Sequence, residues 1–145
     1  MGIWNRDFTL ADLERMSKGT MIEHLGIEYT EIGPDFLAAT MPVDHRTRQP
    51  AGLLHGGASV ALAETLGSVA ANLVTGMEDA PSSCVGLDIN ANHIRPKRSG
   101  LVRGVTRPLH LGRRTQIWEI RITDEDDRLV CVSRLTMAVL TPQGG

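Results

Sequence analysis

Aromatic residues are scarce in this chain: Phe, Trp and Tyr make up only 3% of its 145 residues. Binding of single-stranded nucleic acid by base stacking needs a row of exposed rings, and so few aromatic residues cannot provide one. The hydrophobic core must instead be built from Leu, Val, Ile, Ala and Met, which dominate the 41% of residues that are hydrophobic.

A surplus of positive charge is also absent. Lys and Arg number 15 against 17 Asp and Glu, so the formal net charge is −2. Proteins that neutralise phosphates normally carry a basic surplus, and we therefore expect no nucleic-acid partner. The hydrophobic and charged fractions are those of an ordinary globular protein, and the length predicts a single domain over residues 1–145.

Cysteine is rare, and the first residues of the sequence do not read as an apolar signal segment. Cys84 and Cys131 lie in apolar runs without a CxxC partner, and the chain begins MGIWNRDF. We therefore expect a reducing, cytoplasmic location. The five histidines show none of the short spacings of zinc sites, so the sequence predicts no metal.

No hydrophobic run long enough to span a membrane is free of ionisable residues. The longest low-charge stretch, Ala51 to Val74, contains His55 and Glu64. An acid in the middle of a membrane-spanning helix would cost on the order of 3 kcal/mol. We interpret the stretch as a buried helix and expect no membrane partner.

Periodicity and turn residues predict the other elements. Apolar residues at helical spacing follow Thr9 and predict a short helix that stops by Gly19. Thr9, or a residue just before it, is the expected N-cap. A short turn over 21–25 ends at Gly26. Alternating segments 26–33 and 35–43 predict a hairpin. The long helix is expected over 57–75 and a loop over 76–83, before strands over 84–93, 101–109, 115–123 and 129–140.

This order of elements is typical of an α+β fold with one antiparallel sheet. Leu62, Leu66, Val69 and Leu73 recur at helical spacing, and a strongly curved sheet could wrap a helix that is buried on all sides. In the strand over 115–123, Trp118 and its alternate neighbours are expected to face the core, leaving the other face wet.

Glu64 is the only ionisable residue between His55 and Glu78. Burial of a carboxylate costs free energy unless the carboxylate is paired with a cation or takes part in catalysis. The alternatives are therefore a salt-bridged acid at an interface and a catalytic group. Ser68 and Asn72 follow at spacings of four and eight residues. The three side chains therefore share one face of the helix.

Two glycines stand where the chain enters this helix. His55, Gly56 and Gly57 could serve turn geometry alone, or could expose backbone N–H groups, backed by the helix dipole, to a carbonyl oxygen that gains negative charge. No phosphate-binding loop motif is present. Gln49, held extended by Pro50, is either a solvated loop residue or an amide that orients water.

Charge is segregated along the chain. No acid occurs between Asp88 and Glu119. Such a run arises by chance on solvated strand faces, but it also predicts a site for an anionic group. The bases in it are Arg95, Lys97, Arg98, Arg103, Arg107, Arg113 and Arg114.

Three separated motifs carry a resemblance over nearly the whole chain: RTRQPAGLLHGGASVALAETLGSVA, VGLDINANHIRP and RPLHLGRRTQIWEI. Together they resemble the hotdog-fold acyl-CoA thioesterases, in the branch with 1,4-dihydroxy-2-naphthoyl-CoA thioesterases and the proofreading thioesterases of enterobactin synthesis. The resemblance implies a curved antiparallel sheet around the long helix, and homodimers that commonly form homotetramers. It implies no metal or redox cofactor, coenzyme A being part of the substrate.

The resemblance also assigns roles to residues. Glu64 matches the catalytic carboxylate, acting as nucleophile or as general base. Gly56 N–H, with His55 beside it, matches the group that polarises the thioester carbonyl, and Gln49 matches an amide near the reacting centre. Ser68 falls where the helix touches the acyl group.

The remaining matches concern substrate binding. Asn72 stands where related enzymes carry an aromatic residue, and we expect it to help select the acyl group. The segments that match those holding coenzyme A comprise Gly86, then His93, Ile94, Arg95 and Pro96, and finally His110, Leu111, Gly112, Arg113, Arg114 and Thr115.

The sequence therefore predicts an acyl-CoA thioesterase acting on aromatic or medium-sized acyl groups. The alternatives are a hotdog-fold hydratase or dehydratase and a non-catalytic acyl-CoA-binding protein. Gly56 precedes Glu64 by eight residues, which is about 12 Å along a helix. If both serve one carbonyl, they must come from different subunits related by a two-fold axis.

Overall fold

The computed structural model describes residues 2–76 and 83–141. Most of the loop expected over 76–83 lies outside the described residues. The elements in chain order are α1 (Leu10–Ser17), α2 (Met21–His24), β1 (Glu28–Ile32), β2 (Leu37–Pro42), α3 (Gly56–Thr75), β3 (Ser83–His93), β4 (Leu101–Leu111), β5 (Thr115–Thr123) and β6 (Leu129–Leu140). Their types and order are those that the periodicity predicts.

Local signals account for the element ends. Thr9 is the N-cap of α1, because its hydroxyl accepts from Asp12 N–H at 3.1 Å while Asp12 accepts from Thr9 N–H at 2.9 Å. This reciprocal pair is a capping box. β4 runs two residues further than expected, to Leu111, because an irregularity between Pro108 and His110 lets the pairing with β5 continue.

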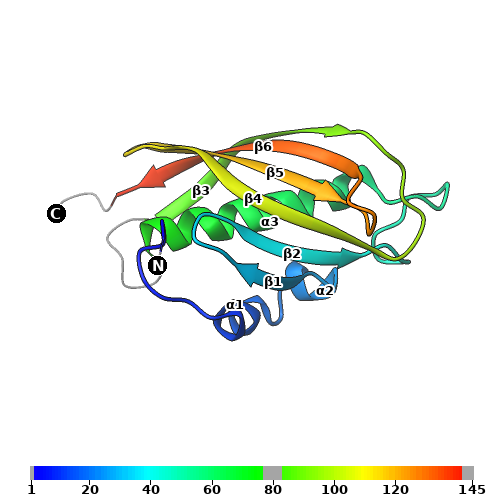
Figure 1. The fold of residues 1–145 in the computed structure, drawn as a ribbon, viewed down its shortest axis with the longest axis horizontal. Coiled ribbons are helices and arrows are strands. Elements are labelled where there is room, and N and C mark those ends of the chain that lie inside the picture. Colours follow the sequence, from blue (N-terminus) through cyan, green and yellow to red (C-terminus); the bar gives the residue numbers. More distant parts are fainter. Residues whose placement is uncertain (1, 77–82, 142–145) are drawn as a thin grey trace.

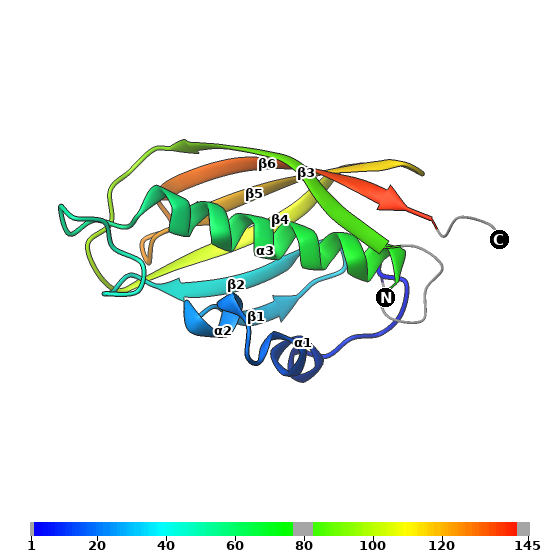
Figure 2. The ribbon, with the colours of Figure 1, turned by 180° about the vertical axis from the view of Figure 1, so that it is seen from behind.

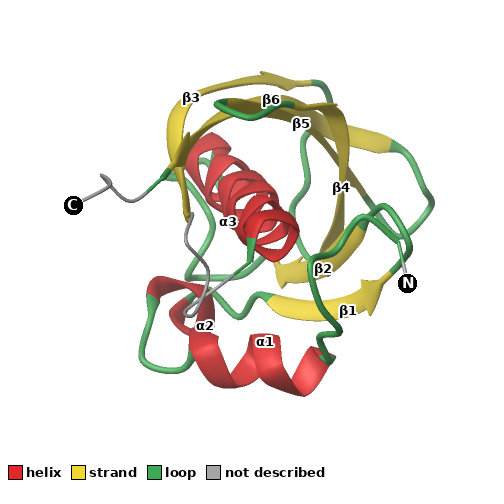
Figure 3. Ribbon diagram, turned by 90° about the vertical axis from the view of Figure 1, so that its left-hand side faces the viewer, coloured by secondary structure: helices red, strands yellow, loops and turns green. Residues whose placement is uncertain are grey.

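One antiparallel sheet of six strands, in the order β1-β2-β4-β5-β6-β3, curves around α3. Figure 1 shows the strands lying across the helix, and Figure 3, viewed along the helix, shows them as an arc around it. α1 packs against β1, and α2 lies at the open side of the arc, beside α3. The predicted curved sheet around a central helix is confirmed.

The apolar face of α3 fills the hollow of the sheet. Leu62, Leu66 and Leu73 are fully buried and Val69 nearly so, as their spacing predicts. In β5, Trp118, Ile120 and Ile122 are buried from the other side. Burial of one such side chain contributes about 1.5–3 kcal/mol, so this contact holds helix and sheet together.

The expectation that α3 is buried on all sides is wrong for the single chain. The arc of strands leaves one side of the helix uncovered, and Figure 2 shows α3 lying in front of the sheet. By length and composition α3 is apolar enough to cross a membrane, yet half of its most apolar window is buried inside the folded chain. The uncovered side carries Glu64, which is exposed.

Candidate active site

Glu64 lies on the uncovered side of α3, against the edge strand β3. A Cβ added to Gly86 would lie 3.1 Å from Glu64 Oε2, so the missing side chain allows the β3 backbone to approach the carboxylate. Within residues 2–76 and 83–141, Glu64 forms no salt bridge. Glu64 is exposed, so the sequence-based interpretation of a buried carboxylate is wrong for the single chain. The sheet ends at β3 and leaves the rest of this side of the helix open.

An open, mostly apolar groove of about 530 Å³ runs beside Glu64. Its walls include Val60, Ser68 and Val69 of α3 and, from outside the helix, Met21 and Ile22 of α2. Sequence reasoning missed Met21 and Ile22. Nothing in their local pattern predicts this position, because only the packing of α2 beside α3 brings them to the groove.

Asn72 is placed differently from Ser68. Its side-chain amide accepts from the N–H of Cys84 at 2.9 Å and donates to the carbonyl oxygen of Cys84 at 3.2 Å and to that of Ser68 at 2.9 Å. Both polar atoms of the amide are therefore engaged by backbone, not directed into the groove.

The other end of α3 holds His55 and Gly56. His55 is the N-cap of the helix, and its Nδ1 accepts from Gly57 N–H at 2.8 Å. Nδ1 accepts only when it carries no hydrogen, so the neutral ring bears its hydrogen on Nε2. The N–H of Gly56 has no backbone acceptor in the described part of the chain and lies at the positive end of the helix dipole.

The segment after β3 meets the same end of α3. A Cβ at Gly56 would lie 2.9 Å from Nε2 of His93, so the His93 ring lies over the start of the helix. Ile94 N–H and Arg95 N–H both donate to the carbonyl of Val130, and residues 94–96 are exposed. The structure therefore brings Gly56 and the segment 93–96 together.

Gln49 belongs to the loop that leads into α3. Its N–H donates to Leu53 O at 2.8 Å, and its side-chain oxygen accepts from Ala51 N–H. The same loop is tied to its neighbour because Leu54 N–H donates to Lys97 O at 2.7 Å and His55 N–H to Thr47 O at 2.8 Å. Gln49 and His55 are thus held on one ordered loop at the start of α3.

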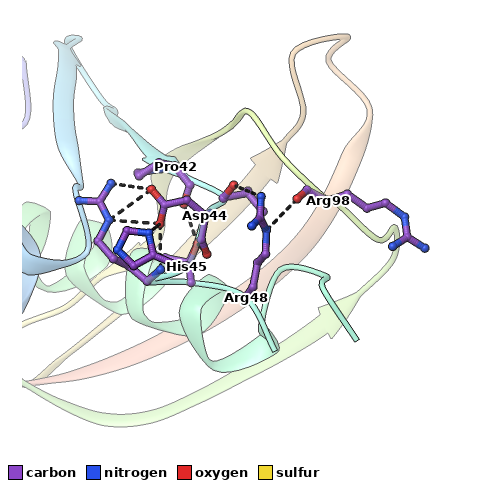
Figure 4. Close-up of polar contacts among 8 residues, drawn as sticks. Pro42, Asp44, His45, Arg48 and Arg98 are labelled. Carbon is purple, nitrogen blue, oxygen red and sulfur yellow. Dashed lines mark hydrogen bonds and ion pairs between the residues drawn. The ribbon is translucent and has the colours of Figure 1, made fainter. Parts of the chain in front are cut away.

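Two charged side chains fix this loop, as Figure 4 shows. Asp44 pairs with Arg46 at 2.7 Å, and this hydrogen bond lowers the pKa of Asp44 to about 2. Arg48 donates from Nε to the carbonyl of Arg98 at 3.0 Å and from Nη2 to that of Val43 at 3.5 Å. Arg48 therefore joins the loop of Gln49 to the basic segment that follows β3.

The turn between β4 and β5 lies at the opposite end of the sheet. His110 Nε2 lies against Gly112, and Gly112 N–H donates to Thr115 O at 2.9 Å to close the turn. Leu111, Arg113 and Thr115 are exposed, as is Arg114. Gly86 belongs to this end, because Gly86 and Gln116 both pair with Met137 of β6.

The basic segment therefore does not form one basic patch in a single chain. The strand β4, with 11 residues, separates Arg95 from Arg113 by on the order of 30 Å at ~3.3 Å per residue. Between them, Arg103 pairs with Glu31 at 3.2 Å and Arg107 lies 3.8 Å from Asp35. The acidic partners of Arg103 and Arg107 thus come from β1 and from the turn that follows it.

The candidate residues divide into two groups. His55, Gly56 and Gln49 lie at the start of α3 with residues 93–96, whereas Glu64, Ser68 and Gly86 lie further along, toward the turn over 110–115. In the described part of the chain, no group of three or more His, Cys, Asp or Glu side chains is placed to hold a metal ion.

Comparison with known proteins decides the family. Residues 51–131 match the model of the thioesterase superfamily. The chain belongs to this superfamily. It is 57% identical over 138 residues to the 1,4-dihydroxy-2-naphthoyl-CoA hydrolase of Escherichia coli, with 95% of this chain and 99% of that protein covered. It is 58% identical over 139 residues to the proofreading thioesterase EntH of Cronobacter turicensis, at 95% and 98% coverage.

Solved structures agree with the sequence comparison. A thioesterase from Haemophilus influenzae superposes with a TM-score of 0.92 at 51% identity, covering 98% of this chain and 97% of that one. A thioesterase variant from Pseudomonas aeruginosa gives 0.92 at 46% identity, with 97% and 99% covered. The predicted hotdog fold and thioester hydrolase activity of the family are thereby confirmed.

The geometry of Arg48 leads to a stability prediction. Arg48→Lys keeps the charge but cannot span both carbonyl acceptors, so we expect a loss of about 1 kcal/mol in the free energy of unfolding. Urea denaturation measures this. Arg134→Lys, at an exposed position in β6, is the control and should change it by less than about 0.5 kcal/mol. Equal stability of the two variants would show that Arg48 does not hold the loops.

Proposed function

We propose that this thioesterase hydrolyses aromatic or medium-sized acyl-CoA thioesters to the free acid and coenzyme A, with Glu64 as nucleophile or general base. The observation that carries the proposal is a carboxylate without a salt-bridge partner, in the described residues, beside an open apolar groove. The relatives support the substrate class, since one is named as a hydrolase of a naphthoyl-CoA.

The two residue groups divide the chemistry between them. Gly56 N–H, at the positive end of α3, donates to the thioester oxygen as it gains charge, an effect of about 10²–10³-fold in rate. Acting as base, Glu64 takes a proton from the water that attacks the carbonyl carbon, worth about 10²–10⁴-fold. The carbon–sulfur bond then breaks, and the thiolate of coenzyme A leaves with the electron pair and is protonated.

Acting as nucleophile, Glu64 itself attacks the carbonyl carbon. An acyl–carboxylate anhydride then forms as the thiolate leaves, and water hydrolyses that anhydride. Both routes need the Glu64 carboxylate ionised and close to the polarised carbonyl. They therefore make the same demand on the geometry of the site.

One chain does not supply a complete site. Gly56 opens the 20-residue helix α3, and Glu64 lies eight residues later, about 12 Å along the axis. A homodimer with two antiparallel copies of α3 would bring Gly56 of one subunit to Glu64 of the other. The uncovered side of α3 is suited to this contact.

The segments proposed to bind coenzyme A are also divided between the two ends of the chain. The exposed segments at 93–96 and 110–115 lie at opposite ends of the sheet, so one coenzyme A molecule touches both only if they come from different subunits. The homodimer meets this requirement, and we further propose that two such dimers pair into the homotetramer that the family resemblance implies. Arg95, Arg98, Arg113 and Arg114 supply charge for the phosphates, and arginine can hold phosphate oxygens bidentately.

Replacement of Glu64 tests its role. Glu64→Gln keeps the shape of the side chain but can neither attack nor accept a proton, so kcat should fall by at least ~10²-fold. Steady-state hydrolysis of benzoyl-CoA and of a medium-chain acyl-CoA measures this, and circular dichroism checks the fold. A folded variant that retains more than about a tenth of wild-type kcat would remove Glu64 from the mechanism.

The two basic ends can be tested separately. Arg95→Ala and Arg113→Ala should each raise KM for acyl-CoA by roughly two- to fivefold and weaken its dependence on salt, with little change in kcat. These side chains would touch the phosphate-bearing part of the substrate and not the reacting carbon. Arg134→Ala is the control for loss of charge, and an unchanged KM in both test variants contradicts the assignment.

The shared site predicts complementation. One inactive variant carries Glu64→Ala, and the other carries both Gln49→Ala and His55→Ala. Refolded together, they should recover about a quarter of wild-type activity, because half of the dimers are mixed and each mixed dimer has one intact site. Differently tagged subunits confirm mixing by co-purification. Mixed dimers that remain inactive would exclude the shared site.

A further inference from the structure

Asn72 is the side chain on α3 that binds both backbone groups of a β3 residue. Its Oδ1 accepts from Cys84 N–H at 2.9 Å, and its Nδ2 donates to Cys84 O at 3.2 Å. A second donation, to Ser68 O at 2.9 Å, fixes the amide relative to its own helix. The amide therefore pairs with β3 as a peptide group of a neighbouring strand would.

This pairing matters because β3 is an edge strand. Its strand partner in the sheet is β6 on one side, and its register shifts between Gly86 and Asp88. An edge strand with an irregular register has fewer bonds that fix its distance from the helix beneath it. Near its start, the Asn72 amide supplies two such bonds, and the Cys84 thiol adds weaker contacts to Ala71 O and Thr75.

The distance between β3 and α3 near Cys84 also determines how close the β3 backbone lies to Glu64. Gly86 follows Cys84 by two residues on β3, and Glu64 precedes Asn72 by eight residues on α3. The Gly86 backbone lies so close to the carboxylate that an added Cβ would stand 3.1 Å from Oε2. Any separation of β3 from α3 at Cys84 therefore enlarges the space into which the Glu64 carboxylate can turn.

We propose that Asn72 is a positioning residue for hydrolysis: by holding the start of β3 on α3, it keeps the Gly86 backbone against the Glu64 carboxylate. The inference rests on the proposed role of Glu64. It gives Asn72 a different task from the selection of the acyl group, because an amide engaged by three backbone groups has no polar atom free for the substrate. An aliphatic side chain cannot do this work, since it has neither donor nor acceptor.

The first experiment measures kcat and KM of Asn72→Ala on several aryl and alkyl acyl-CoA thioesters. Misplacement of a catalytic group by a fraction of an ångström should lower kcat by about tenfold on every substrate, with KM within about twofold of wild type. Asn5→Ala is the matched control, because Asn5 also donates its amide to a carbonyl of α3, Thr75 O, but forms no hydrogen bond to β3 within the described residues. It should leave kcat unchanged.

The second experiment asks whether Asn72 acts through β3. Gly86→Ala pushes a methyl group toward Glu64 Oε2 and should lower kcat. In the Asn72→Ala background β3 can move away, so the same substitution should lower kcat by at least about threefold less than in wild type. A merely structural role for Asn72 would make the two effects multiply independently, and that result would overturn the proposal.

The remaining outcomes are also decisive. Asn72→Ala with wild-type kcat, or with losses confined to some acyl groups, overturns the proposal, the latter in favour of direct acyl selection. If Asn72→Ala does not fold, Asn72→Asp replaces it, since its side chain has the same length and can accept from Cys84 N–H but cannot donate to Cys84 O, and it should give an intermediate kcat. Glu64→Gln is assayed alongside. An active Glu64→Gln defeats the proposed function, whereas an inactive one with fully active Asn72→Ala defeats only this inference.

Discussion

The packing of one face of α3 into the hollow of the curved sheet determines the rest of the structure. Leu62, Leu66 and Leu73 are fully buried there, and this fixes the rotation of the helix about its axis. Glu64 and Ser68 must then lie off the buried face, and Glu64 meets only the edge strand β3, because a helix presents residues out of phase with its apolar stripe to another side. The candidate site is a consequence of how the core is filled.

The same packing divides the site between two ends of the chain. Backbone bonds and Arg48 hold the loop with Gln49 and His55 at the start of α3, and the turn over 110–115 lies at the far end of the sheet. A rigid helix and an extended sheet cannot bend to bring these ends together. In the proposed function an interface between subunits brings the two ends to one substrate, which is why that proposal includes assembly.

Within the described residues, the lack of a salt-bridge partner distinguishes Glu64 from the acids that arginines hold. Asp44 and Asp124 are paired with arginines, whereas Glu64 lies against the Gly86 backbone beside an apolar groove. That arrangement depends on the distance between α3 and β3, and Asn72 bonds these two elements directly. Asn72, which lies away from the reacting atoms, can thus affect the Glu64 carboxylate by fixing the position of β3.

The sequence by itself determined the order and type of the elements, the buried stripe of α3, the cap at Thr9 and the family, because these depend on local periodicity and on contiguous motifs. The tertiary structure alone decided that Glu64 is exposed in one chain, that Met21 and Ile22 line its groove, that Asn72 binds Cys84, and that the basic run is split. Each of these depends on contacts between residues distant in sequence. Spacing along a chain gives the face on which a residue lies, but the fold decides what that face meets.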